Sequence, residues 1–338
     1  MKKILTVFGI IVCCLLMCNV DVSYGFEIQD LNSYNLYSKL KMLDATLNVK
    51  DLNNNIFNTA EKNVSIGGSS LWWIDSNISV LESNNSGIEI NSNPLLINLG
   101  YNFGSFNSMS GSIIASFRKY KLDVKVFSKD KEMPEEQYFA LSFYNKIDVG
   151  NNFIFSSMIS GSCSKLQYLI QETNIQYYNN GMDKTISTYS EETNEYLLNL
   201  TLMLSVAHNY NLFDRFKLVS KIDTDLNIIG IFDSDYSGSS NLVLSPSIEL
   251  GLMKDIFYNT IAPSVYVKYD ANLINRKEYF YLNDDKTNKT EKMKLHDDCF
   301  EYGAKLNIHL LDNIDFKVLY SKNSNKVSNF GGSFGVKF

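Results

Sequence analysis

Apolar residues recur at every second position over most of this chain downstream of about residue 94. The pattern is clear between residues 195 and 208, where the even positions are apolar: Tyr196, Leu198, Leu200, Leu202, Leu204 and Val206. Successive side chains of a β-strand point to opposite faces, so this period predicts strands with one apolar face. No long segment in this region has the apolar spacing of a helix. We therefore predict an all-β fold.

The connections between the predicted strands alternate in length along the chain. Short ones fall near 105–109, 148–151, 209–213, 254–257 and 312–313. Long polar ones fall near 129–136, 172–193, 229–240 and 275–297, with a brief one at 323–327. A transmembrane β-barrel has this asymmetry, because alternate hairpins lie on opposite sides of the membrane. A soluble β-sandwich, whose strands also alternate, is the competing interpretation.

The last strand of the chain ends on an aromatic residue, with apolar residues alternating before it: Phe330, Phe334, Val336 and Phe338. Over about residues 94–338 the sequence resembles bacterial outer-membrane β-barrel proteins. In that family the assembly machinery reads such a terminal strand. The resemblance therefore implies an assembly signal at these four residues, localisation in the outer membrane, and outer-membrane lipid and the assembly machinery as partners.

The alternation delimits eleven strands, at 94–104, 110–128, 137–148, 152–171, 194–208, 214–228, 241–253, 258–274, 299–311, 314–322 and 328–338. Bacterial single-chain barrels have an even number, so residues 26–93 must supply at least one more strand. Candidates are 40–50 and 64–75. We expect an antiparallel up-and-down transmembrane barrel of about 12 strands, within a range of about 10 to 14. The rest of 26–93, which is rich in Asn and Ser, is expected to form a stub, an outer loop or a plug.

The N-terminus has the features of a secretory signal peptide. Lys2 and Lys3 precede an apolar run from Ile4 to Met17, and small residues follow at Ser23 and Gly25. The run is shorter than the roughly 18 residues of a membrane-spanning helix. We predict a signal peptide at residues 1–25 with cleavage after Gly25. A lipoprotein site at Cys18 is the alternative.

Composition excludes several classes of function. The net charge of -6 argues against a nucleic-acid partner, because such proteins present concentrated basic surface. Outside the signal peptide only Cys163 and Cys299 remain, which gives no disulfide framework. The sequence contains no phosphate-binding loop and no cysteine pair at zinc spacing, so we expect no cofactor and no metal.

Charged residues of both signs occupy the face of the strands opposite to the apolar one. The predicted lumen residues are Lys119, Lys121, Asp123, Lys125, Lys217, Lys221, Asp223, Asp225, Glu249, Lys268, Asp270, Glu301, Lys305, His309, Asp315 and Lys317. Mixed charges are compatible with a small channel for ions or small hydrophilic solutes, which is the preferred hypothesis. They are also compatible with a filled or plugged barrel that acts as a surface-exposed structural protein or adhesin.

An enzyme is the third class of function considered. Proteases resembling the omptin family place Asp and His at the outer rim of a barrel, and His296, Asp297 and Asp298 have those residue types. The family also needs an acidic pair across the mouth, for which only Asp183, or Asp233 with Asp235, is available. We predict no catalytic residues and no enzymatic activity.

Overall fold

The fold is taken from a computed structural model of the 338-residue chain. It describes residues 49–64, 71–85, 88–106, 108–120, 122–126, 129–132, 136–178, 183–213, 215–233, 238–256, 260–271, 279–284, 289–294, 298–310, 313–324 and 327–338. The predicted signal peptide lies outside the described residues and stays a prediction.

Twelve strands form a closed antiparallel barrel. Each strand pairs with its neighbours in the ring, and the last pairs with the first, for example Val336 with Ile74. Closure matters because every backbone donor and acceptor must be satisfied where water is absent. The prediction of an all-β antiparallel barrel of about 12 strands is confirmed. The ring consists of β1 (Leu71–Asn85), β3 (Leu95–Phe106), β4 (Met109–Tyr120), β7 (Glu136–Gly150), β8 (Phe153–Tyr178), β9 (Asp183–Phe213), β10 (Phe216–Asp233), β11 (Gly238–Lys254), β12 (Ile261–Asp270), β15 (Cys299–Leu310), β16 (Ile314–Asn323) and β17 (Val327–Lys337).

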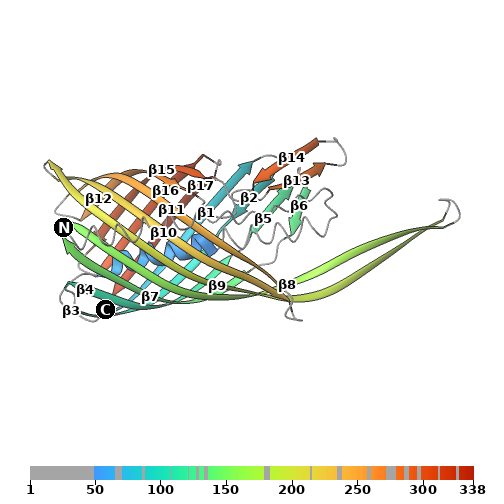
Figure 1. The fold of residues 1–338 in the computed structure, drawn as a ribbon, viewed down its shortest axis with the longest axis horizontal. Coiled ribbons are helices and arrows are strands. Elements are labelled where there is room, and N and C mark those ends of the chain that lie inside the picture. The colour runs from blue at the N-terminus through green and yellow to red at the C-terminus, as the bar shows by residue number, and fades with distance from the viewer. Residues whose placement is uncertain are drawn as a thin grey trace.

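The two ends of the barrel differ. At one, the short-turn end, lie the β3–β4, β7–β8, β9–β10, β11–β12 and β15–β16 connections, together with the start of β1 and Phe338. Two of these turns are tight enough to need left-handed backbone, at Gly150, Asn151 and Asn152 and at Arg215. The opposite, long-hairpin end carries the short strands β2 (Ile88–Ser92), β5 (Leu122–Val126), β6 (Lys129–Glu132), β13 (Tyr279–Asp284) and β14 (Lys289–Lys294) (Figure 1).

Several predicted segments differ from the structure at the long-hairpin end. The connection expected near 229–240 is shorter, because β10 and β11 stay paired as far as Phe232 and Gly238. The connection expected near 172–193 is instead a continuation of β8 and β9, which stay paired as far as Tyr178 and Asp183 and project well beyond the barrel (Figure 1). The strand expected at 110–128 is divided, because β4 ends at Tyr120 and β5 pairs with β2 outside the ring.

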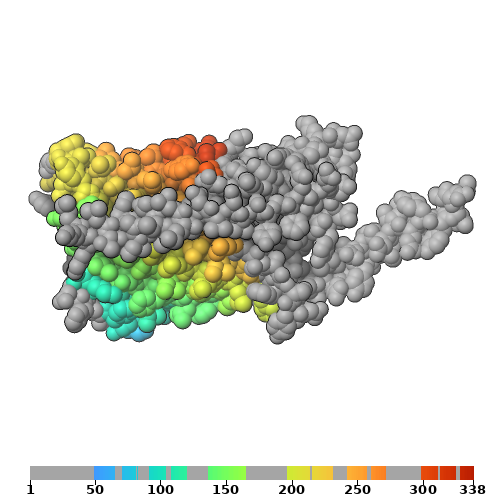
Figure 2. All heavy atoms as spheres, in the orientation of Figure 1, coloured from blue at the N-terminus to red at the C-terminus, as the bar shows by residue number. Residues whose placement is uncertain are grey.

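The outer surface of the barrel is apolar. Phe139, Leu200 and Ile248 each keep 53–54% of their surface exposed. The residues next to them in the sequence point into the lumen and are more buried. On β7 burial alternates residue by residue from Glu136 to Tyr144. Figure 2 shows one side of this outer surface. Such a surface suits hydrocarbon, because lipid then replaces a second protein layer.

A helix at residues 49–63 lies inside the barrel (Figure 1). We call it the plug helix. The sequence left two ranges open for the extra strand, 40–50 and 64–75, and the structure has β1 at Leu71–Asn85. No helix among the described residues is long and apolar enough to cross a membrane.

Candidate functional site

The plug helix packs its apolar side against the barrel wall. Its apolar residues follow helical spacing, and all are nearly or fully buried: Val49, Leu52, Ile56, Phe57, Ala60 and the following Val64. Phe57 meets Tyr144 of β7 edge to face, with ring centroids 5.4 Å apart. The Lys221 ammonium of β10 lies 5.0 Å from the centre of the Phe57 ring. The helix is therefore held by a core of its own within the lumen.

Polar side chains anchor the first turns of the plug helix. Asp51 forms an ion pair of 2.6 Å with Arg118 of β4, whose side chain is 1% exposed. The Asn53 amide donates to Thr201 of β9 at 2.7 Å and to Asn227 of β10 at 3.2 Å. Buried polar groups are costly unless they are bonded, so these contacts fix the position of the helix as well as stabilising it.

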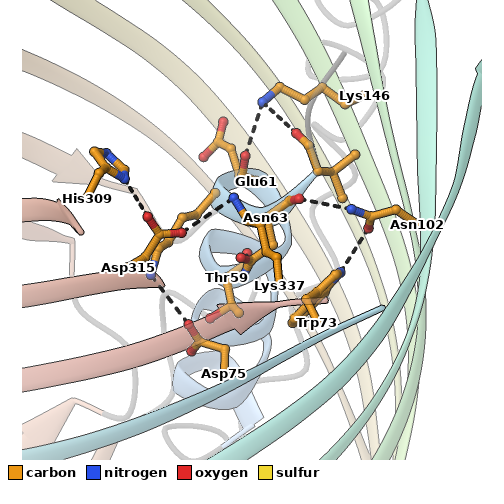
Figure 3. A network of polar contacts seen from close by, with 12 residues as sticks. Thr59, Glu61, Asn63, Trp73, Asp75, Asn102, Lys146, His309, Asp315 and Lys337 are labelled. Carbon is orange, nitrogen blue, oxygen red and sulfur yellow. Dashed lines mark hydrogen bonds and ion pairs between the residues drawn. The ribbon is translucent and has the colours of Figure 1, made fainter. Parts of the chain in front are cut away.

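The last turn of the plug helix is capped by the wall. Lys146 of β7 donates to the carbonyls of Glu61 at 3.1 Å and Val64 at 3.3 Å, and the Asn102 amide of β3 donates to the Asn63 carbonyl at 2.9 Å (Figure 3). A helix C-terminus leaves carbonyl groups without partners within the helix, and cations stabilise it. The strands thus supply the caps that the helix lacks.

Ionic contacts continue around the same end of the helix. The Glu61 carboxylate accepts from Lys221 at 3.1 Å, and Lys62 pairs with Asp75 of β1 at 3.5 Å. Asn102, which caps the helix, also accepts from the Trp73 indole at 2.8 Å. Figure 3 shows Trp73, Asp75, Asn102 and Lys146 reaching from several strands towards the last turn.

The direction of the plug helix follows from these partners. Lys146 and Asn102 lie near the β7–β8 and β3–β4 turns, so the helix ends close to the short-turn end. Arg118, which binds Asp51, lies near the other end of β4. The helix therefore starts towards the long-hairpin end and runs back through the lumen to β1.

Small inward side chains make room for the helix on one wall of the lumen. The inward positions of β4, β7 and β8 include eight buried serines: Ser110, Ser112, Ser116, Ser142, Ser156, Ser160, Ser162 and Ser164. Larger or charged side chains there would occupy the space that the helix fills.

The opposite wall carries most of the charge, and most of its charges are paired. Lys305 of β15 binds Glu249 of β11 at 2.9 Å and lies 3.9 Å from the centre of the Tyr266 ring. Lys268 and Asp270 of β12 form a pair of 3.1 Å. Opposite charges at these distances neutralise one another within the lumen, as the sequence allowed.

Most of the predicted lumen residues lie on inward positions of this wall. They are Lys217, Lys221, Asp223, Asp225, Glu249, Lys268, Asp270, Glu301, Lys305, Asp315 and Lys317. His309 lies at the short-turn end, where its Nδ1 is 2.5 Å from Asp315 (Figure 3). Whether any of these residues contacts a solute stays a prediction.

The prediction of which residues of β4 point into the lumen was wrong. Lys119 is exposed, and its neighbour Arg118 points into the lumen. The prediction of a single strand at 110–128 fails because β5 lies outside the ring and does not set the face of β4. Asp123 and Lys125 lie on β5, and Lys121 lies outside the described residues.

The structure describes only some of the acidic and histidine residues that an omptin-like protease site would use. His296, Asp297 and Asp235 lie outside the described residues, while Asp183 and Asp233 are on β9 and β10 at the long-hairpin end. Within the described ranges, no group of three His, Cys, Asp or Glu residues is arranged to hold a metal ion.

The C-terminal residues lie on the outer face. Phe330, Phe334 and Phe338 are 57%, 41% and 66% exposed. The backbone of Phe338 exchanges two hydrogen bonds with Trp72, of 2.9 and 3.0 Å, so the last residue of the chain sits at the seam where the barrel closes. A role of these residues in assembly stays a prediction.

Comparison with solved structures identifies the fold. The translocator domain of the autotransporter NalP from Neisseria meningitidis matches with a TM-score of 0.58 and 12% identity, over 87% of this chain and 97% of that one. The chain folds as a bacterial outer-membrane β-barrel. The transport unit of AIDA-I from Escherichia coli matches with a TM-score of 0.54 and 10% identity, over 80% of this chain and 90% of that one.

A third barrel of this kind, the β-domain of the Bordetella autotransporter BrkA, matches with a TM-score of 0.51 and 10% identity, over 80% of this chain and all of that one. No protein-family model and no curated protein matches the sequence. At these identities the likeness establishes the architecture of this outer-membrane barrel and leaves its activity open.

Proposed function

We propose that this protein is a plugged outer-membrane barrel, closed to solutes at rest by its own helix, whose function is exercised by the hairpins at the long-hairpin end. The observation that carries the proposal is the seating of the plug helix. It contacts side chains of β1, β3, β4, β7, β9 and β10 through ion pairs, hydrogen bonds and an aromatic pair.

This proposal explains the distribution of residues in the lumen. Serines face the helix on one wall, paired charges fill the other, and the helix carries complementary groups to both. A permanently open channel of about twelve strands would gain nothing from such a fitted helix. The projecting β8–β9 hairpin gives the long-hairpin end a large surface for contact with other molecules.

Single-channel recording in planar bilayers tests the closed state. We expect the wild-type protein to give no sustained conductance, and a variant lacking residues 49–63 to give discrete steps. Sustained wild-type steps of the same size as those of the deletion variant would contradict the proposal and favour the small channel. Because a deletion can impair folding, recovery of the heat-resistant folded form on a denaturing gel must be checked first.

The direction of the plug helix favours a second candidate, a translocator that delivers its own N-terminal segment to the long-hairpin mouth. Support comes from the start of the helix, which lies towards that mouth, and from the similarity of the barrel to translocator domains of autotransporters. An epitope inserted between residues 30 and 31 tests this candidate. Antibody binding on intact cells would favour delivery, and binding only after permeabilisation would exclude it.

A further inference from the structure

A small polar cavity lies beside the plug helix, next to Asn55, whose side-chain oxygen accepts a hydrogen bond of 3.3 Å from Asn77 of β1. It has a volume of about 50 Å³ and lies between the helix and strands β1, β16 and β17. Its lining residues are Asn55, Asn58, Thr59, Lys62, Asn77, Ser79, Lys317, Leu319, Asn329, Gly331, Gly332 and Ser333. Small residues on β17 leave this space open. On the wall formed by β4 and β8, by contrast, the helix itself fills the space beside the serines.

The charge of this lining is entirely positive. Two lysines, Lys62 from the helix and Lys317 from β16, face the cavity, and none of its lining residues is acidic. The Lys62 ammonium is buried without a hydrogen-bond acceptor, its nearest carboxylate being Asp75 at 3.5 Å. The hydroxyls of Ser79 and Ser333 and the amide of Asn58 add neutral donors.

Lys317 differs from the other lumen lysines. Lys217, Lys221, Lys268, Lys305 and Lys337 each have a carboxylate within 2.5–3.5 Å. Among the described residues, none lies within ion-pair distance of Lys317, which is nevertheless partly buried between β15 and β17. An unpaired buried cation is unfavourable, so a site that retains one is suited to a counter-ion from solution.

We infer that this cavity binds a small inorganic anion, held between Lys317 and Lys62 at the seam of the plug helix and the barrel. A buried water needs about 10–15 Å³, so the cavity admits a halide or a small oxyanion and excludes organic anions of sugar size. The anion would join the helix to β16 and β17, to which no hydrogen bond or ion pair between described residues ties it.

Thermal unfolding in detergent tests the inference. The unfolding temperature is measured while sodium gluconate is replaced by sodium chloride, or by inorganic phosphate, at constant ionic strength. We expect a saturable rise of about 2 °C at an anion concentration tenfold above Kd. The site prefers a halide if the rise in unfolding temperature saturates at a lower concentration of chloride, and an oxyanion if it saturates at a lower concentration of phosphate.

Lys317→Met is the informative variant, because it removes the unpaired charge and retains most of the volume. It should lose the saturable rise and should unfold at a higher temperature than the wild type in gluconate. Lys305→Met is the matched control, since Lys305 is paired with Glu249 at 2.9 Å. It should unfold at a lower temperature in every buffer but keep the anion-dependent rise.

Two results would overturn the inference. One is the absence of saturation in the wild type, with only the gradual rise that salts produce by exclusion from protein surfaces. The other is an equal rise in Lys317→Met. Crystals soaked in bromide add a direct readout, because an anomalous peak is expected between Lys62 and Lys317. None of these outcomes depends on whether the barrel conducts.

Discussion

Replacement of Phe57 by alanine should loosen the plug helix while leaving the barrel closed. Phe57 is 2% exposed and packs edge to face on Tyr144, whereas the strands around it are held by their own backbone ladders. A buried Phe→Ala change costs about 3–5 kcal/mol. Since about 1.4 kcal/mol is a factor of ten, a loss of about 3 kcal/mol raises the unseated population of the helix at least about 100-fold.

Two assays separate the helix from the barrel. Heat-resistance on a denaturing gel reports the barrel, and open time in a planar bilayer reports the helix. We expect Phe57→Ala to keep the heat-resistant form and to open more often than the wild type. Asn54→Ala is the control, because Asn54 is only half-buried and no hydrogen bond to the wall is described for it. Equal open times in Phe57→Ala, Asn54→Ala and the wild type would refute the packing argument.

Three further changes test other parts of the account. Leu200→Arg on the outer face should lower the free energy of unfolding in lipid vesicles by about 2–4 kcal/mol, and an unchanged value would place this face away from hydrocarbon. Gly100→Ala should cost about 1–3 kcal/mol and shift Trp73 fluorescence, because a Cβ there would lie 2.1 Å from the Trp73 ring; normal stability and fluorescence would contradict this close approach. Phe338→Ala should reduce the amount of assembled barrel in the outer membrane without changing the melting temperature of the fraction that assembles, and wild-type assembly would exclude the C-terminal signal.

The barrel itself was predictable because alternation is a strong signal when it recurs over many strands. On β10, Lys221, Asp223 and Asp225 alternate with apolar residues, and the structure places these three in the lumen. The prediction of inward positions from this alternation was wrong on β4, where the inward residues are mainly serines. Serine is not strongly polar or apolar, so the sequence of β4 contains little information about which face points into the lumen and which faces lipid.

A plug was one of the alternatives predicted for residues 26–93, but its helical structure was not predicted, although its apolar residues have helical spacing. Asn53, Asn54 and Asn55 lie within it, and Asn has a low intrinsic helix propensity. The wall overrides that preference, because Asn53 bonds to Thr201 and Asn227, and Lys146 and Asn102 cap the last turn. These partners are distant in sequence, so only the closed barrel brings them together.

The location of the plug helix is the central claim, and a cross-link tests it directly. In a background with Cys163 and Cys299 changed to Ser, cysteines at positions 53 and 201 should be joined by a short reagent with two thiol-reactive groups, such as a bis-maleimide, because the native side chains are 2.7 Å apart. Cysteines at positions 53 and 159 form the control pair, since Ile159 is 54% exposed on the outer face. Cross-linking of the first pair alone is predicted. Failure of the first pair in the folded barrel, or equal yields for both pairs, would contradict a helix inside the lumen.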